Sequence, residues 1–189
     1  MIAYLSALHE RTFETIEKQA EGWLTGLTAR FVFAAVLLVY YLNSASTKVG
    51  DGAFGFLSIT DNAYFQILPS VVEAHGFDVT QVPFFPYGLV VAAGTYSEFL
   101  LPTLIVLGLF TRIAALGMIG FTIVQSFVDI AYHGVDMTTV GAWFDRFSDA
   151  AILDQRALWI FLLLYLVAHG PGRCSLDALL AARRDRQPQ

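Results

Sequence analysis

A single glutamate, Glu98, interrupts one of the most apolar stretches of the sequence, residues 87–110. A carboxyl group in such surroundings can exchange a proton, form a buried ion pair or hydrogen-bond the head group of an apolar ligand. A charged side chain at the centre of a membrane helix costs at least about 2.5 kcal/mol on insertion scales, so it needs a polar partner or a hydrated cavity. Glu98 is therefore the leading candidate for a proton-active or ion-paired residue.

Three further polar residues are expected at about the same membrane depth. A helical rise of about 1.5 Å per residue places Glu98 and Gln125 roughly 20 Å from the inner membrane surface. Asp129 follows Gln125 by one helical turn, and Arg156 is expected at a similar height. Asp129 and Arg156 can also reach the outer interface by extending their polar ends. The spacing predicts one polar layer to which three helices contribute.

Two roles for this layer remain open. In the structural one, Glu98 forms a buried ion pair with Arg156 or Arg30 that fixes the helix register. In the functional one, Glu98 exchanges a proton or hydrogen-bonds the head group of a bound quinone. Arg30 itself is expected as an interfacial anchor if its helix begins at Phe31, and as a buried residue if the helix begins at Trp23.

The cysteine and histidine pattern predicts no metal site. Cys174 is the only cysteine, which excludes an intramolecular disulfide, a CxxC pair and a cysteine-ligated cluster. We interpret Cys174 as an inert, buried thiol near the inner membrane edge. No two histidines have the i, i+3 or i+4 spacing that would pair metal ligands on one helix face, the four being His9, His75, His133 and His169.

The elements that must position these residues are four membrane-spanning helices. Hydrophobic residues make up 56% of the 189-residue chain and charged residues only 14%, whereas soluble domains are about a quarter charged. The mean hydropathy is +0.60. A span needs about 20 mostly apolar residues, and four stretches qualify, at residues 24–45, 87–110, 112–132 and 152–168. The prediction is an all-α, four-transmembrane-helix bundle, with a tight hairpin between the second and third spans.

Lysine and arginine placement predicts that both termini lie in the cytoplasm, because cytoplasmic segments carry an excess of these residues. With the N-terminus inside, only Lys48, Arg146 and Arg156 fall outside. Eight cationic residues then lie on or near the inner side, namely Arg11, Lys18, Arg30, Arg112, Arg173, Arg183, Arg184 and Arg186. The net charge of −5 argues against a nucleic-acid partner.

Three segments outside the spans are also informative. Residues 1–22 alternate apolar and charged positions at helical spacing, which predicts an amphipathic helix on the inner surface. The outer segments, residues 50–86 and 135–151, are rich in aromatic residues. They are expected either to pack at the lipid interface or to form a lid over a lipid-soluble ligand. Residues 23–178 form the four-helix domain, and residues 179–189 a basic cytoplasmic tail.

Several motifs, in order, resemble those of the DoxX-like family of membrane proteins. Arg30 near the start of the first span and Lys48 after its end resemble the family's Arg…Lys frame. The second span resembles the family pattern in Glu98, Gly108, Thr111 and Arg112. The last span ends in a Gly-Pro-Gly turn that stops the helix, followed by a serine and an aspartate either of which can cap a short helix. These residues, which resemble the family's ending, are Gly170, Pro171, Gly172, Ser175 and Asp177.

The resemblance implies a four-helix bundle of the bacterial cytoplasmic membrane. Some related proteins are subunits of a thiosulfate:quinone oxidoreductase, so quinone is the implied cofactor and an oxidoreductase subunit the implied partner, beside the lipid bilayer. The resemblance makes Arg30, Glu98 and Arg112 the expected functional positions, near a quinone or a small anion, with Arg30 or Arg112 as the charge partner of Glu98. The expected binding residues are Arg30, Lys48, Arg112, Gln125, Asp129 and Arg156. Two other classes remain open, a small transporter that acts as a homo-oligomer and a non-catalytic assembly factor.

Overall fold

The computed structural model describes residues 2–20 and 24–184, and this part of the chain is helical, without strands. Its α-helices are α1 (Ile2–Gln19), α2 (Thr25–Phe33), α3 (Val39–Ser46), α4 (Asp61–Ile67), α5 (Pro69–Ala74), α6 (Leu89–Leu107), α7 (Thr111–Ala131), α8 (Met137–Val140), α9 (Arg156–His169) and α10 (Leu176–Arg184). The ends of two predicted segments, residues 21–22 and 185–189, lie outside the described residues.

Four helical segments are long and apolar enough to span a membrane, as the sequence predicted. Short π-helical turns join α2 to α3 and extend α6 and α9 at their N-terminal ends. The resulting segments are Thr25–Ser46, Phe84–Leu107, Thr111–Ala131 and Ala151–His169. Their bounds agree with the predicted spans to within three residues, because a long apolar stretch determines where such a helix lies.

A small core holds these four helices together. Phe33, Leu37 and Tyr41 follow one another at i, i+4 spacing and are at most 1% exposed, so they form one buried face along α2 and α3. Against this face pack Ile105 of α6, Ala114, Ala115 and Met118 of α7, and Leu163 and Leu166 of α9.

Most of the apolar surface faces outward. Only 22–33% of the most apolar window of each long helix is buried inside the protein. Large side chains on the outer faces are mostly exposed, among them Phe31, Val39, Ile113 and Phe161. Water-soluble proteins rarely leave so large a contiguous apolar surface uncovered. The arrangement fits a multi-pass membrane protein in which lipid tails cover these faces.

A three-residue turn joins α6 to α7 and forms the predicted tight hairpin. Gly108 ends α6 in the left-handed conformation, at φ 69°, which glycine adopts without steric cost. The helix therefore ends at Leu107, whereas the sequence predicted Phe110.

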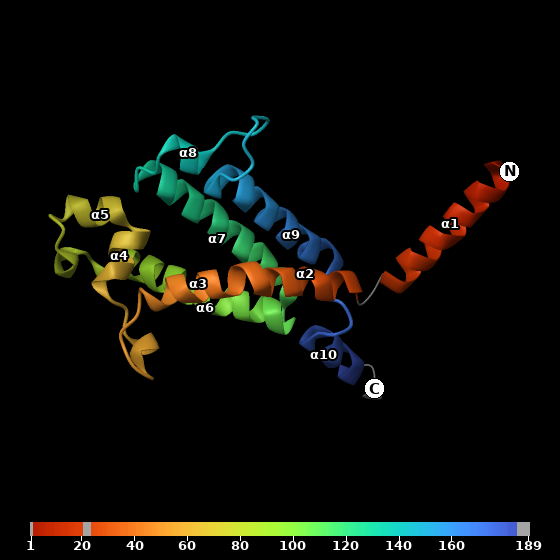
Figure 1. Cartoon of the computed structure of the whole chain (residues 1–189). Coiled ribbons are helices and arrows are strands. Elements are labelled where there is room, and N and C mark those ends of the chain that lie inside the picture. Colours follow the sequence, from red (N-terminus) through yellow and green to blue (C-terminus); the bar gives the residue numbers. More distant parts are fainter. Residues whose placement is uncertain (1, 21–23, 185–189) are drawn as a thin grey trace.

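The two outer segments, which connect the first span to the second and the third to the fourth, lie at one end of the bundle. Figure 1 shows α4, α5 and α8 at this end, and α1 and α10 at the opposite end. Several aromatic side chains of the two outer segments are exposed, including Phe54, Phe85, Trp143 and Phe144. In the second segment, hydrogen bonds from Thr138 and Thr139 lower the pKa of Asp136 to about 2.

The N-terminal helix α1 lies apart from the four-helix bundle (Figure 1). Its apolar side chains Tyr4, Leu5, Leu8, Phe13 and Ile16 are between 50 and 73% exposed. An amphipathic helix with a free apolar face is typical of a segment that lies in the membrane interface. The predicted domain boundary after residue 178 falls within α10.

Candidate ligand-binding cleft

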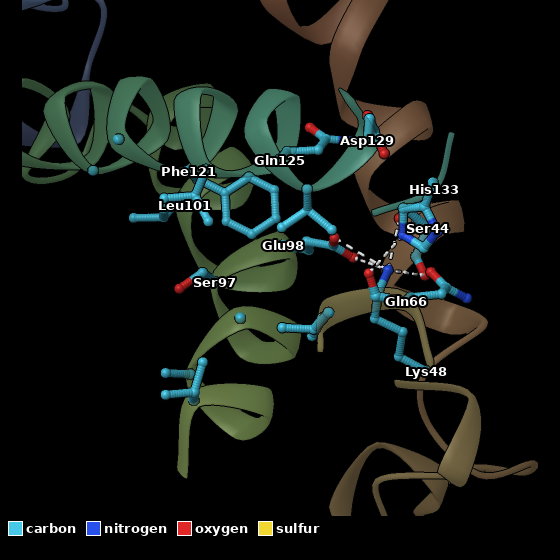
Figure 2. Close-up of a pocket in the computed structure, with 18 residues that line it drawn as sticks. Ser44, Lys48, Gln66, Ser97, Glu98, Leu101, Phe121, Gln125, Asp129 and His133 are labelled. Atoms are coloured by element: carbon cyan, nitrogen blue, oxygen red, sulfur yellow. Dashed lines mark hydrogen bonds and ion pairs between the residues drawn. The ribbon is translucent and has the colours of Figure 1, made fainter. Parts of the chain in front are cut away.

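Glu98 forms a buried ion pair with Lys48. The Lys48 Nζ lies 2.8 Å and 3.1 Å from the two carboxylate oxygens, and the two side chains are 3% and 5% exposed. Lys48 follows the end of α3, and its ammonium also donates to the carbonyl and the hydroxyl of Ser44, one turn earlier. Figure 2 shows the two side chains pointing toward each other from neighbouring segments.

The predicted partners of Glu98, Arg156 and Arg30, are therefore wrong. Arg30 lies 18 residues before Lys48, which corresponds to roughly 27 Å of helix, so it lies at the opposite end of the bundle. Lys48 was assigned to the outer surface because it follows the apolar stretch, but its flexible stem lets the ammonium reach back below the end of the helix.

A second ion pair joins α7 to α9. Arg156 Nη2 lies 2.6 Å from Oδ2 of Asp129, and Nη1 donates to the Ser126 hydroxyl at 2.9 Å. The guanidinium also lies 6.0 Å from the ring centre of Trp159. Asp129 and Arg156 thus neutralise each other inside the protein. The sequence also allowed their polar ends to extend to the outer membrane interface instead.

A cleft of about 550 Å³ lies beside the first ion pair, mainly between α6 and α7. Lys48, Glu98, Gln125 and Asp129 line it, together with apolar and small residues: Val90, Ala93, Gly94, Leu101, Gly117, Gly120, Phe121, Val124 and Val128. Figure 2 shows Leu101 and Phe121 on one side of Glu98 and Lys48 on the other. From Gly117 to Asp129 the cleft follows α7 for roughly 18 Å. It therefore has an apolar groove and a polar end.

Small residues keep the groove open. A Cβ atom added to Gly120 would meet nothing within 4 Å, and one added to Gly117 would lie 3.2 Å from the Leu101 side chain. Cleft-lining side chains near these glycines, such as Val124, are exposed. A long apolar chain could lie in this groove from the lipid side.

Two residues of the polar end were not predicted from the sequence. Gln66 of α4 and His133, two residues beyond the end of α7, line the cleft. The His133 ring contacts the Gln66 carbonyl at 3.1 Å, and the Gln66 amide donates to the Thr47 hydroxyl at 3.0 Å. No periodic pattern surrounds either residue, so only the tertiary fold brings them beside Gln125 and Asp129.

The predicted polar layer is thus present in part. Glu98, Gln125 and Asp129 line the same cleft, and Arg156 contacts it through Asp129. Gln125 donates to the Tyr40 hydroxyl at 2.9 Å, while its own Oε1 atom is buried without a hydrogen-bond partner. An unpaired buried acceptor is costly, so a donor from a ligand or a water molecule would be stabilised there.

Arg30 belongs to a different structure at the other end of the bundle. It is 8% exposed, and its guanidinium donates to four backbone carbonyls, at Ile105, Val106, Pro171 and Cys174. The first two carbonyls end α6, and the last two belong to the turn after α9. Arg30 is therefore buried and joins three helices, which is the second of the two settings that the sequence left open for it.

The C-terminal motif, residues 170–177, packs at the same end of the bundle as Arg30. Asp177 accepts hydrogen bonds from the backbone N–H groups of Phe110 and Thr111 at 2.7 and 3.0 Å, and so caps α7. Ser175 caps α10 through the N–H of Ala178 at 3.2 Å. The expected capping residues are both used, but Asp177 acts on another helix. Gly172 and Pro171 pack so closely on Gly26 that a Cβ there would lie 2.6 Å from their backbone.

Arg112 and Cys174 differ from their predicted settings. Arg112 is exposed and lies against Gly170, away from Glu98. Cys174 is exposed, so its thiol is not the buried one that was expected. Among the described residues, no three histidine, cysteine, aspartate or glutamate side chains form a group that could hold a metal ion.

These features define an all-helical protein with four helices that could span a membrane and a cleft between two of them. Comparisons with models of protein families, with curated proteins and with solved structures find no match to this chain. The function is therefore inferred from the geometry of the cleft and from the sequence motifs.

Proposed function

We propose that this chain is a DoxX-type protein of the bacterial inner membrane that binds a quinone in the cleft between α6 and α7. The observation that supports this most strongly is the combination of an apolar groove with a polar end that contains the buried Lys48–Glu98 pair. A quinone has the matching form, with a small polar head group and a long apolar tail. The head group would lie beside Gln125, and the tail would follow Gly120 and Gly117.

The charges of the cleft favour an uncharged ligand. Lys48 neutralises Glu98, and Arg156 neutralises Asp129. Fatty acids and anionic phospholipids would bring a charge that no free cation of the cleft offsets, and uncompensated buried charge is costly. A neutral quinone avoids this penalty. In this proposal Glu98 and Lys48 shape the polar end, and electrons pass to or from an oxidoreductase partner, as the family resemblance implies.

Replacing Gly120 with leucine should block the groove without unfolding the protein. The new side chain enters open space at its Cβ, and leucine is favoured over glycine in a helix by about 0.5–1 kcal/mol. Overfilling a packed site costs about 1–3 kcal/mol, which corresponds to roughly a 5- to 150-fold loss of affinity. Quinone that co-purifies with the protein, measured by mass spectrometry of lipid extracts, should fall accordingly.

Ala131→Leu provides the matched control, because Ala131 is exposed on the same helix and does not line the cleft. It should keep the wild-type amount of quinone. If purified wild-type protein carries no quinone and binds none when it is added, the proposal is wrong. Equal occupancy in Gly120→Leu and wild type would place the quinone elsewhere.

The exposed Cys174 allows the proposed orientation to be tested in cells. It is the only cysteine of the chain, and it lies at the end of the bundle that the proposal places in the cytoplasm. A membrane-impermeant maleimide should label Cys174 in inverted membrane vesicles and leave it unlabelled in intact cells. A Cys174→Ser, Ser70→Cys variant should show the opposite pattern, because Ser70 is exposed in α5 at the other end. Labelling of Cys174 in intact cells would show that the orientation is the opposite of the proposed one.

A further inference from the structure

The polar end of the cleft offers a ligand mainly hydrogen-bond acceptors. The Lys48 ammonium has three hydrogens, and they are directed at the Ser44 carbonyl, the Ser44 hydroxyl and the Glu98 carboxylate. Lys48, which lines the cleft, therefore has no hydrogen left for a ligand. Arg156 donates to Asp129 and Ser126 through its two terminal nitrogens. Its Nε–H has no partner among the described residues, but Arg156 itself does not line the cleft.

The acceptors, in contrast, are only partly used. Oε1 of Gln125 is buried and has no partner among the described residues. Asp129 binds Arg156 through Oδ2, which leaves Oδ1 available. His133 contacts the Gln66 carbonyl through Nε2, and because a carbonyl only accepts, Nε2 carries the hydrogen.

Few donors oppose these acceptors. The free hydrogens are the second amide hydrogens of Gln66 and Gln125, whose first ones are given to Thr47 and Tyr40. The Ser97 hydroxyl at the cleft wall can both donate and accept. A ligand that only accepts hydrogen bonds would leave the Gln125 oxygen unpaired, whereas a ligand with hydroxyl groups would satisfy it.

We propose that the cleft selects the reduced, hydroquinone form of its ligand over the oxidised quinone, an inference that rests on the proposed function. A hydroquinone head group carries two hydroxyl donors, while the quinone has two carbonyl acceptors. The paired charges at this end sum to zero, so a neutral donor fits better than an ammonium group. The difference between making and missing one hydrogen bond to a buried acceptor corresponds to about a 10-fold change in affinity.

The test compares three short-tailed probes of nearly equal size with the protein in lipid nanodiscs. These are decylubiquinone, its hydroquinone kept reduced under nitrogen, and the dimethyl ether of that hydroquinone, which has no donors on the ring. Equilibrium dialysis should show the hydroquinone bound about 10-fold more tightly than the other two. The ether separates loss of the donors from the change in ring oxidation state, and it needs no mutation.

A variant adds a second measurement. Gln125→Met keeps the side-chain length and removes both the acceptor and the amide donors, so the hydroquinone should lose more affinity than the quinone and the preference for the hydroquinone should shrink. Gln81→Met, in an exposed outer turn away from the cleft, should keep the full preference. Equal binding of hydroquinone and quinone, or tighter binding of the quinone, would overturn this inference and leave the proposed function standing. Binding of none of the three probes would overturn both.

Discussion

Lys48→Met should destabilise the protein by about 3–5 kcal/mol, because it leaves the Glu98 carboxylate buried without its cation. Both side chains of the pair are at most 5% exposed, so water cannot replace the lost ammonium. The free energy of unfolding, measured in bicelles by titration with sodium dodecyl sulfate and followed by circular dichroism, should report the loss.

Two further variants test whether the loss of stability comes from an unpaired buried charge. The double variant Lys48→Met, Glu98→Gln removes both charges and should recover most of the lost stability, since apolar replacements of a buried pair are often nearly neutral. Lys18→Met breaks the exposed pair between Lys18 and Glu14, 3.8 Å apart, and should change stability by less than about 1 kcal/mol. A Lys48→Met protein as stable as wild type would contradict the buried pair.

Arg30→Gln should release the C-terminal motif from the bundle. The substitution removes donors from the carbonyls of Ile105, Val106, Pro171 and Cys174, and each buried carbonyl left unpaired costs about 1–3 kcal/mol. We expect a loss of at least about 3 kcal/mol. Hydrogen exchange followed by mass spectrometry should show faster exchange in residues 105–111 and 171–184, where Arg30 and Asp177 now hold the backbone.

Arg30→Lys should rescue little of this loss, because a single ammonium cannot span four carbonyls on two segments as the planar guanidinium does. Arg11→Gln is the matched control, since Arg11 is an exposed arginine of α1, at the same end of the bundle but outside the C-terminal motif. In this control variant, the backbone amides of residues 105–111 and 171–184 should exchange at the wild-type rate. Unchanged exchange in Arg30→Gln would mean that Asp177 and the close packing at Gly26 are sufficient to hold the motif.

The four long helices could be predicted from the sequence because their cause is local. Each is a run of about 20 apolar residues, and the turn between α6 and α7 follows from Gly108, which has a positive φ. The capping role of Ser175 was also within reach, since the pattern of a serine before a short helix is local.

The partners of the polar residues could not be predicted in this way. Counting along helices placed Glu98 and Gln125 at similar depths, and both line the cleft. Depth does not determine which cation reaches Glu98, however, because the flexible stem of Lys48 extends back over one helical turn. Arg30 was misjudged for a related reason. Its partners are backbone carbonyls of segments more than 70 residues away, and carbonyls have no sequence signature.

The cleft itself follows from contacts that no single segment encodes. The sequence offers no periodic pattern around Gln66 or His133, and they meet only when α4 and the end of α7 pack at the same end of the bundle. The glycines of α7 give a clearer signal in retrospect. Gly117 and Gly120 lie on one face of a helix that would be more stable without them, which indicates that the face needs space.

The most direct test of the proposed function is a cryo-electron microscopy map of the protein purified in native lipid, with a bound antibody fragment to add mass. We expect planar density at the polar end of the cleft, within hydrogen-bonding distance of Gln125, and a tail that continues past Gly120. An empty cleft, or a two-tailed phospholipid in it, would contradict the proposed quinone site.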